Sequence, residues 1–292
     1  MNEFPDDMDA LEEDPDSLIA SINDLYSHNQ ETLEAIHILE AELEEMEDPV
    51  GIHITLFDLY SELENMQEAG QCLVEASRRV GEDSHSDLVY FLYNQLELFA
   101  QLSPEAQSAY ERLGHMIAAN REAFEPSTVE LDQRKLFMQD FIPELLLTQH
   151  LMHSEYLSPD EYHTVIQDLC WYGGKTQTSP RVCLYVLSDR QLPREARAIE
   201  FLSRDAAMPY IDLTLIDPDP DLLEVLSYES CVRRAACVFG EVGGEPMVAL
   251  LNPFNLQLRE DVARRLDCDP HFFVTSAPGY THFLDIQRAA AE

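Results

Sequence analysis

Two apolar runs that meet at a pair of glycines constrain the fold of this chain more than any other feature. The runs span 235–241 and 246–251, and Gly243 and Gly244 lie between them. Glycine reaches the positive φ values that a two-residue hairpin turn requires, so the pattern predicts a β-hairpin. Around the hairpin, the spacing of apolar residues predicts helices over 222–234, 256–266 and about 280–291, and a further strand over 271–274. These short alternating elements indicate a small α+β unit.

The first part of the chain has a different pattern. From Leu18 to about residue 119, apolar residues recur three and four positions apart, which is typical of amphipathic helices. The pattern is interrupted at Asp48 and Pro49, because a proline disrupts a helix. Up to that point, we expect a pair of short antiparallel helices rather than one long helix.

A short internal repeat accompanies the helical pattern. Leu-Tyr-Ser at 25–27 recurs at 59–61, and Ala35 recurs as Ala69, each at an offset of 34 residues. This period belongs to tetratricopeptide repeats, and residues 54–81 resemble one such unit. The resemblance implies two helices that approach closely at Ala69. A third unit is expected further along, over 88–119, although its register departs from 34. A plain helical bundle is the alternative, and either fold offers a helical surface without a catalytic constellation.

Composition limits the classes of partner. The 292 residues include 56 Asp and Glu against 18 Lys and Arg, a formal net charge of −38. Such a surface repels phosphate groups, so we expect no nucleic acid and no anionic membrane as partners, and we expect basic protein surfaces instead. Residues 1–16 hold eight acids and no base, which predicts a disordered acidic tail. Without a signal peptide, a long apolar run or paired cysteines, the chain is expected to be cytoplasmic with free thiols.

The second half resembles a known domain. The sequence Met-Pro-Tyr-Ile-Asp-Leu at 208–213 is similar to Leu-Pro-Tyr-Val-Asp-Leu in the amino-terminal (MshEN-type) domain of type II secretion and type IV pilus assembly ATPases. Asn-Pro-Phe-Asn at 252–255 stands where that family shows Asp-Pro-Leu-Asp. The best-matching stretch is 208–286, and the likeness begins near residue 141. It implies a helical subdomain followed by a small α/β subdomain.

In that family, the helical subdomain carries two copies of a motif that binds cyclic di-GMP through Arg-Leu-Gly and a later glycine. The first copy here spans 146–169 and has Glu155 in place of the later glycine. The second begins at Arg181 and has Arg190 at that place. Arginine stacks on bases and pairs with phosphate, whereas a carboxylate repels a dianion. We therefore expect the scaffold to persist without cyclic di-GMP binding. If binding persists, Arg181, Arg190 and Arg194 are the candidate ligands.

Together these features predict a fold of the α+β class. We expect an acidic tail at 1–16, an all-α helical-repeat (tetratricopeptide-like) domain at 17–125 and a linker helix at 126–140. An MshEN-like helical subdomain at 141–207 and a small α/β subdomain at 208–292 are expected to follow.

Motifs for catalysis and cofactors are weak. The Gly-Gly-Lys-Thr sequence at 173–176 imitates the end of a phosphate-binding loop, but Leu169 stands where the first glycine of that loop belongs. His150, His153 and His163 have no tight ligand pairing nearby, so we expect surface or partly buried histidines rather than a metal site. The sequence contains no nucleophile motif, and Trp171 is expected to pack in a core. The expectation is a chain that is not an enzyme and that holds no metal or cofactor.

The combined expectation is a non-enzymatic, bacterial, cytoplasmic adaptor that links a pilus or secretion apparatus to a second protein. The alternative is a regulator that senses cyclic di-GMP. The acids near the end of the first helical region form a candidate docking surface for a basic partner, with Glu44 and Glu45 as the test residues. A solvated acidic face without a partner explains the same residues. The acids are Glu31, Glu34, Glu40, Glu42, Glu44, Glu45, Glu47 and Asp48.

Overall fold

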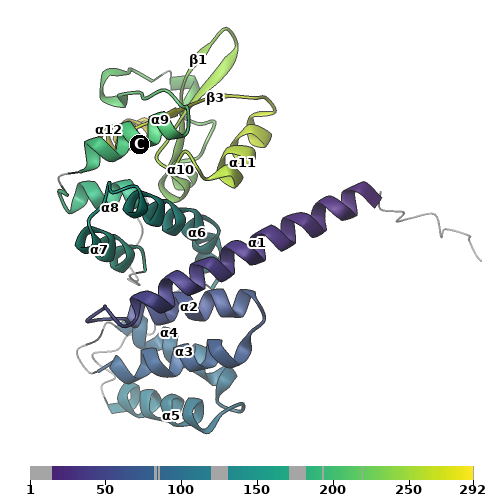
Figure 1. The fold of residues 1–292 in the computed structure, drawn as a ribbon, viewed down its shortest axis with the longest axis vertical. Helices are drawn as coiled ribbons and strands as arrows, with labels where there is room; N and C mark the ends of the chain where they lie inside the picture. The colour runs from purple at the N-terminus through teal and green to yellow at the C-terminus, as the bar shows by residue number, and fades with distance from the viewer. Residues whose placement is uncertain are drawn as a thin grey trace, which may run out of the picture.

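The protein consists of two parts, one above the other in Figure 1: a stack of helices, and a second half that ends in a small sheet. The computed structural model describes residues 15–81, 84, 86–119, 131–170, 182–192, 194–218 and 220–291. Residues 1–14 of the predicted tail (1–16), the boundary near residue 126, Trp171, the glycine loop at 173–176 and Arg181 lie outside the described residues. The last two residues of that predicted tail are helical. The α+β class is confirmed, since the described part is mostly helical with one three-stranded sheet.

The first helix, α1, is longer than the sequence predicted. It runs without a break over Pro15–Glu42, so the predicted pair of short antiparallel helices is wrong. No glycine or proline follows Pro15 within these 28 residues, so nothing in the backbone forces a turn there. Residues 25–27 therefore lie inside a continuous helix, and the 34-residue recurrence does not relate two helical hairpins.

Two antiparallel helical hairpins form the rest of the stack, and the first of them contacts α1. Glu64 makes the first turn with a left-handed φ of 58°, and the Asn65 N–H donates to the Tyr60 carbonyl at 2.8 Å. Ala69 is fully buried, in agreement with the close approach inferred from the sequence. A Cβ on Gly70 would lie 2.8 Å from the Phe99 ring, so only glycine fits where the two hairpins meet. The hairpins are α2 and α3 (Val50–Glu62 and Met66–Arg79) and α4 and α5 (Ser86–Phe99 and Pro104–Ala119).

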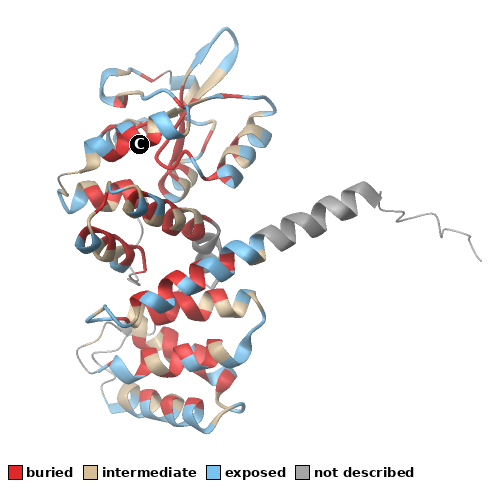
Figure 2. Cartoon of the chain, viewed as in Figure 1, coloured by how far each residue is buried: buried red, intermediate tan, exposed pale blue. Residues whose placement is uncertain are grey.

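The hairpins do not keep the 34-residue period. The starts of α4 and α5 follow those of α2 and α3 by 36 and 38 residues. The described part thus shows stacked helical hairpins, and the tetratricopeptide identification is not confirmed. The outer face of α5 is mostly exposed and polar, so this helix closes the stack at its far end (Figure 2).

The second half begins with four helices. The first, α6 (Leu131–His153), continues across residue 141, so the expected linker helix and the start of the helical subdomain are parts of one helix. It contains Pro143 and no glycine. The other three are α7, α8 and α9, at Pro159–Leu169, Cys183–Asp189 and Glu195–Asp205. Contacts between α1 and α6 join this half to the stack.

The α/β unit follows the predicted order closely. Strands β1 (Ala236–Val242) and β2 (Glu245–Leu250) pair antiparallel across the predicted turn, where φ is 66° at Gly243 and 90° at Gly244. Strand β3 (His271–Val274) pairs parallel to β2, which gives the order β1-β2-β3. Helix α11 (Leu256–Leu266) and β3 have the predicted bounds, and α12 (Ala277–Ala291) begins three residues early.

One predicted helix is shorter. Residues 222–234 form the end of a 3-10 turn, η2 (Pro220–Leu222), and then a short helix, α10 (Tyr228–Arg234). The α-helix starts late because the Ser227 hydroxyl accepts a hydrogen bond from the Ser230 N–H and caps it there.

The core of this unit lies between the sheet and its helices (Figure 2). Tyr280 on α12 is fully buried, and its hydroxyl donates to the Cys231 carbonyl at 3.0 Å. A second 3-10 turn, η1 (Leu213–Leu215), packs against α12, and α9 contacts β3. Five of the six cysteines are buried and all six are free thiols, as expected. Within the described ranges, no helix is long and apolar enough to cross a bilayer.

Candidate functional site

The two expected copies of the nucleotide motif correspond to two helix–turn–helix units, α6–α7 and α8–α9. The turn residue with left-handed φ is Glu155 in the first unit (61°) and Gln191 in the second (52°). Each turn closes with a 2.8 Å hydrogen bond, from the Tyr156 N–H to the Leu151 carbonyl and from the Leu192 N–H to the Leu187 carbonyl. The conformation explains a family preference for glycine at this place, because residues with a Cβ rarely adopt it.

This geometry corrects the alignment of the second copy. Glu155 and Gln191 are 36 residues apart, and so are the first residues of α7 and α9, Pro159 and Glu195. The sequence alignment used an offset of 35 and assigned the glycine position to Arg190. The structure assigns it to Gln191, one residue later. With the offset of 36, Val182 rather than Arg181 aligns with Leu146, the first residue of the first copy.

Arg190 is held by an acidic side chain of the neighbouring unit. Its Nε and Nη2 donate to the two carboxylate oxygens of Asp168 on α7, at 2.7 and 2.6 Å. This bidentate hydrogen bonding raises the pKa of the Arg190 guanidinium further above its usual range. The Arg190 guanidinium that would bind a phosphate is therefore already paired with a carboxylate.

Arg194 connects the two units in a similar way. Its Nη1 donates to the Glu155 carbonyl at 3.2 Å, and its Nε lies 3.6 Å from Oε2 of Glu161. Glu161 in turn completes a capping box with Ser158 at the start of α7. Arg190 and Arg194 thus both connect α7 to the second unit through contacts with its acidic side chains.

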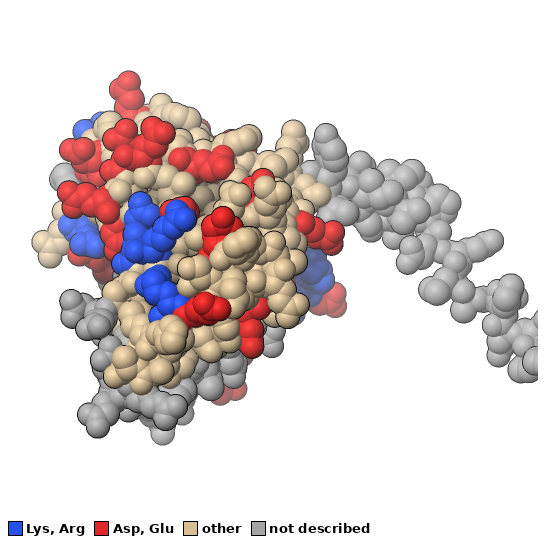
Figure 3. All heavy atoms as spheres, turned by 90° about the horizontal axis from the view of Figure 1, so that it is seen from below, with Lys and Arg blue, Asp and Glu red and all other residues tan. Residues whose placement is uncertain are grey.

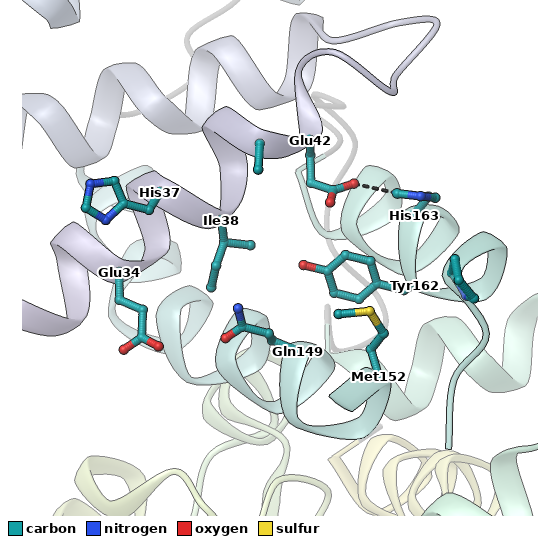
Figure 4. A pocket seen from close by; sticks show the side chains of 10 residues that line it. Glu34, His37, Ile38, Glu42, Gln149, Met152, Tyr162 and His163 are labelled. Carbon is teal, nitrogen blue, oxygen red and sulfur yellow. Dashed lines mark hydrogen bonds and ion pairs between the residues drawn. The ribbon is translucent and has the colours of Figure 1, made fainter. Parts of the chain in front are cut away.

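A separate groove lies between α1, α6 and α7 (Figure 4). Its volume is about 370 Å³. Ile38 of α1 and Tyr162 of α7 are buried at its base, and Met152 of α6 is half-buried beside them. Burial, followed by the nearby Glu42 carboxylate, raises the pKa of the Tyr162 hydroxyl well above its usual range. The lining residues are Glu34, His37, Ile38, Ala41, Glu42, Gln149, Met152, Pro159, Tyr162 and His163.

One ion pair borders the groove and connects the two halves. Nδ1 of His163 on α7 lies 2.5 Å from Oε2 of Glu42, the last residue of α1 (Figure 4). The Glu42 side chain is 10% exposed and that of His163 is 34% exposed. The α1–α7 junction therefore combines a half-buried ion pair with an open apolar groove.

The two test residues chosen from the sequence do not line this groove. Glu44 and Glu45 are exposed in the turn that follows α1. Sequence reasoning included Glu34 and Glu42 among the acids and weighed His163 as a metal ligand, but it did not bring them together. It missed Ile38, Met152 and Tyr162, which resemble ordinary core positions in the sequence.

Two of the three histidines considered for a metal site, His150 and His163, have other partners. Nε2 of His150 lies 3.0 Å from Oδ2 of Asp205 on α9, and the His150 ring packs edge-on against Phe254. Across the ranges that the structure describes, no three His, Cys, Asp or Glu side chains converge in a way that could hold a metal ion.

The junction between α6 and the α/β unit has a different chemistry. Glu144 is fully buried on α6; its two carboxylate oxygens accept from the Asn252 amide and the Cys183 N–H, both at 2.8 Å. One turn earlier, Oδ1 of Asp140 accepts from the Asn255 amide at 3.2 Å and pairs with Arg234 at 3.3 Å. The two asparagines of Asn-Pro-Phe-Asn therefore contact two buried carboxylates spaced four residues apart on one helix.

Burial shifts the protonation of both acids in the same direction. It raises the pKa of Glu144 to about 7, against the opposing hydrogen bonds from Cys183 and Asn252. Burial also raises the pKa of Asp140, although Arg234 and Asn255 oppose that shift. Amide groups suit this place because each asparagine donates to a carboxylate, whereas aspartates would add two more negative charges.

Charge is unevenly spread over the stack of helices. Between residues 15 and 119, the basic residues are Arg78, Arg79 and Arg112. Figure 3 looks at the molecule from below, toward α5, and shows basic side chains gathered on one part of that face with acids around them. Arg112 of α5 donates to the Val80 carbonyl at 3.3 Å and also to the Ser77 carbonyl, both at the end of α3. Helix α1, at the other end of the stack, carries no lysine or arginine.

Comparison with known proteins agrees with the resemblance found in the second half. Residues 206–278 match the MshEN domain family. Of the solved structures, one described as "Structure of MshE with cdg" is similar over 48% of this chain and 97% of that chain, with 20% sequence identity and a TM-score of 0.34. No match was found among curated proteins. The chain thus contains an MshEN domain at 206–278, preceded by helices that this match does not cover.

Proposed function

We propose that this protein is a non-enzymatic cytoplasmic adaptor that docks onto a component of a pilus or secretion apparatus. The MshEN match at 206–278 supports the link to such machinery, since domains of this type belong to type II secretion and type IV pilus assembly ATPases. The stack of helices, α1–α5, supplies a second surface on the same chain. Two surfaces of different chemistry on one chain suit a protein that connects two others.

Affinity capture from the native host tests this proposal. The full chain, tagged at one end, is expected to enrich at least one pilus or secretion component over a tag-only control, as measured by quantitative mass spectrometry at low salt. If no such component is enriched, the adaptor proposal fails.

A matched pair of surface variants shows whether the MshEN domain does the docking. Leu215 on η1 and Leu98 on α4 are both exposed leucines, at 80% and 68% exposure. Leu215 lies inside the matched range and Leu98 lies outside it. We expect Leu215→Glu to reduce capture of the machinery component and Leu98→Glu to leave it unchanged, because a charge disrupts an apolar contact only where the contact exists.

The acidic docking surface has its own test. Glu44 and Glu45 are exposed beside the end of α1. If a basic partner docks there, Glu44→Lys with Glu45→Lys slows association several-fold with the fold intact, and added salt has the same effect on the wild type. Unchanged association would mean that these acids serve solubility alone.

The second candidate is a regulator that binds cyclic di-GMP through Arg181, Arg190 and Arg194. The observation in its favour is that Arg190 and Arg194 both lie in the turn between α8 and α9, and that Arg194 contacts the Glu155 carbonyl in the corresponding turn of the first unit. It requires Arg190 to leave Asp168, which costs a charge-assisted pair. Titration calorimetry with cyclic di-GMP decides between the candidates: a micromolar affinity that Arg181→Ala abolishes would favour the regulator.

A further inference from the structure

We propose that the groove between α1, α6 and α7 binds a short basic, amphipathic segment of the partner protein. The inference rests on the adaptor function proposed above and specifies where, and by what chemistry, one partner is held. Apolar side chains of the segment would pack into the groove over Ile38, Met152 and Tyr162, and its lysines or arginines would face Glu34, the exposed acid of the lining (Figure 4).

The shape of the groove fits a chain segment. It is an open depression of about 370 Å³ at the meeting point of three helices. Ala41, with its small side chain, and Pro159 leave space between the walls, and both are exposed. Met152 can adjust to different apolar side chains because its chain is flexible and unbranched. Grooves of this kind commonly receive the apolar face of an amphipathic helix.

The charge of the walls selects a basic occupant. No lysine or arginine occurs before residue 78, nor between residues 136 and 174, and these two ranges contain every lining residue. Glu34 is exposed on the α1 wall, and the acids of the α1–α2 turn continue the negative field beyond Glu42. A cationic segment gains from the acids of the α1 wall, whereas an anionic segment is repelled by them.

Other occupants fit less well. The chain's own N-terminal residues, 1–14, contain seven acids and no base, so like charges oppose their return to the groove. A second copy of this chain would bring its own net charge of −38 to an acidic surface. A basic partner meets neither obstacle.

Binding here has a structural consequence. The α1 wall belongs to the stack of helices and the α7 wall belongs to the second half. In the described part, Glu42 and His163 form the ion pair that connects these two walls. A segment seated in the groove would therefore hold the two halves of the molecule together.

The test uses a defined peptide as the probe. A fluorescein-labelled peptide of about 18 residues carries leucines on one helical face and lysines on the other, and a control peptide has glutamate in place of each lysine. Fluorescence anisotropy with the full chain is expected to show binding of the lysine peptide, weaker between about 50 and about 300 mM salt, and none of the glutamate peptide.

Three variants locate the binding. Ala41→Trp fills the groove and should weaken the lysine peptide at least about tenfold. Glu34→Lys should weaken it several-fold, whereas Glu105→Lys, the same change of charge on exposed α5, should have less than about a twofold effect. Circular dichroism checks that each variant is folded. Equal effects of Glu34→Lys and Glu105→Lys, or full binding to Ala41→Trp, would overturn the inference in favour of unspecific attraction.

Two further outcomes have distinct meanings. Self-association of the unliganded chain in sedimentation that Ala41→Trp abolishes would assign the groove to a second copy and overturn the proposal. If the wild type captures a machinery component and Ala41→Trp captures it equally, the groove inference fails while the adaptor function stands.

Discussion

The two junctions that hold this molecule together differ in almost every physical respect. Between α6 and the α/β unit, Asp140 and Glu144 are buried and hydrogen-bonded to Asn255 and Asn252. Between α1 and α7, the half-buried pair of Glu42 and His163 borders an open groove. Breaking a buried, hydrogen-bonded network costs far more than breaking a half-exposed pair.

The difference indicates a division of roles. The α6 junction fixes the helical units to the MshEN domain, so these two parts should move as one body. The α1 junction leaves an open groove and the exposed carboxylate of Glu34 available, as a docking surface requires. We therefore expect changes at the first junction to alter stability and changes at the second to alter binding.

The largest effect should come from Asn252, one of the two asparagines at the α6 junction that stand where the MshEN family shows aspartate. Asn252→Asp restores the family residue but removes the amide that donates to Glu144 at 2.8 Å and to the Pro143 carbonyl at 3.1 Å. It also places a second carboxylate next to the buried carboxylate of Glu144. We expect a loss of about 3–5 kcal/mol in the free energy of unfolding, measured by urea denaturation.

The control for this change is Asn65→Asp. Asn65 is exposed at the start of α3 and its side chain makes no capping hydrogen bond. The same substitution there should cost well under about 1 kcal/mol. If the two variants lose equal stability, the buried network does not have the importance assigned to it.

The second effect is a pH dependence at the same junction. The pKa of Glu144 is raised to about 7 in the folded protein, from the value of 4.5 that a fully hydrated glutamate has in the unfolded chain. The folded state therefore holds this proton longer, and stability falls as pH rises from about 4.5 to about 7. The wild type should lose up to about 3 kcal/mol over this window relative to Glu144→Gln, which does not titrate.

Urea denaturation of both proteins at several pH values measures that difference. Above about pH 7, the difference in the free energy of unfolding between wild type and Glu144→Gln should stop changing. The Glu144 carboxyl is then ionised in both the folded and the unfolded state. A constant gap across the whole range would show that Glu144 stays ionised when folded.

The α1 junction should respond less. His163→Gln removes the ion pair with Glu42 and should cost at most about 1 kcal/mol, because the His163 side chain is 34% exposed. Hydrogen exchange should rise in the last turn of α1 and the first turn of α7. His28→Gln is the matched control: His28 pairs with Glu62 at 2.9 Å within the stack, so its loss should leave α7 unchanged. Faster exchange in α7 in the control would contradict the comparison.

The smallest effect is expected at Arg190. Its ion pair with Asp168 is bidentate, but its side chain is 55% exposed. Arg190→Ala should therefore cost no more than about 0.5 kcal/mol, seen as a shift of about 2 °C or less in thermal unfolding. A much larger loss of stability would contradict this prediction and show that the Arg190–Asp168 pair is important for the fold.

The sequence predicted the α/β unit well because its signals are local. Gly243 and Gly244 specify the hairpin, and Asn255 caps α11, so each boundary depends on residues next to it. The order of helices and strands also agreed with the MshEN resemblance. Only the helix before β1 was too long, since the Ser227 cap was not recognised.

Features that depend on distant residues were not predictable. Helix α1 lacks any residue that forces a break, and only packing against α2 and α6 determines its length and position. The sequence alignment placed the glycine position at Arg190, one residue before Gln191. The exact position of the turn depends on which backbone hydrogen bond closes it, and the sequence does not show that bond. The groove joins Ile38 with Met152 and Tyr162, which are more than a hundred residues away in sequence.

Cross-linking of the captured complex tests the central claim most directly. A carbodiimide joins carboxylates to the lysines of a bound partner without a spacer, which suits a chain with 56 acids. We predict that a pilus or secretion component captured from the native host links through its lysines to Glu34 and the neighbouring acids of α1. Links concentrated on Glu105 and the α5 end, or spread evenly over the surface, would contradict the account.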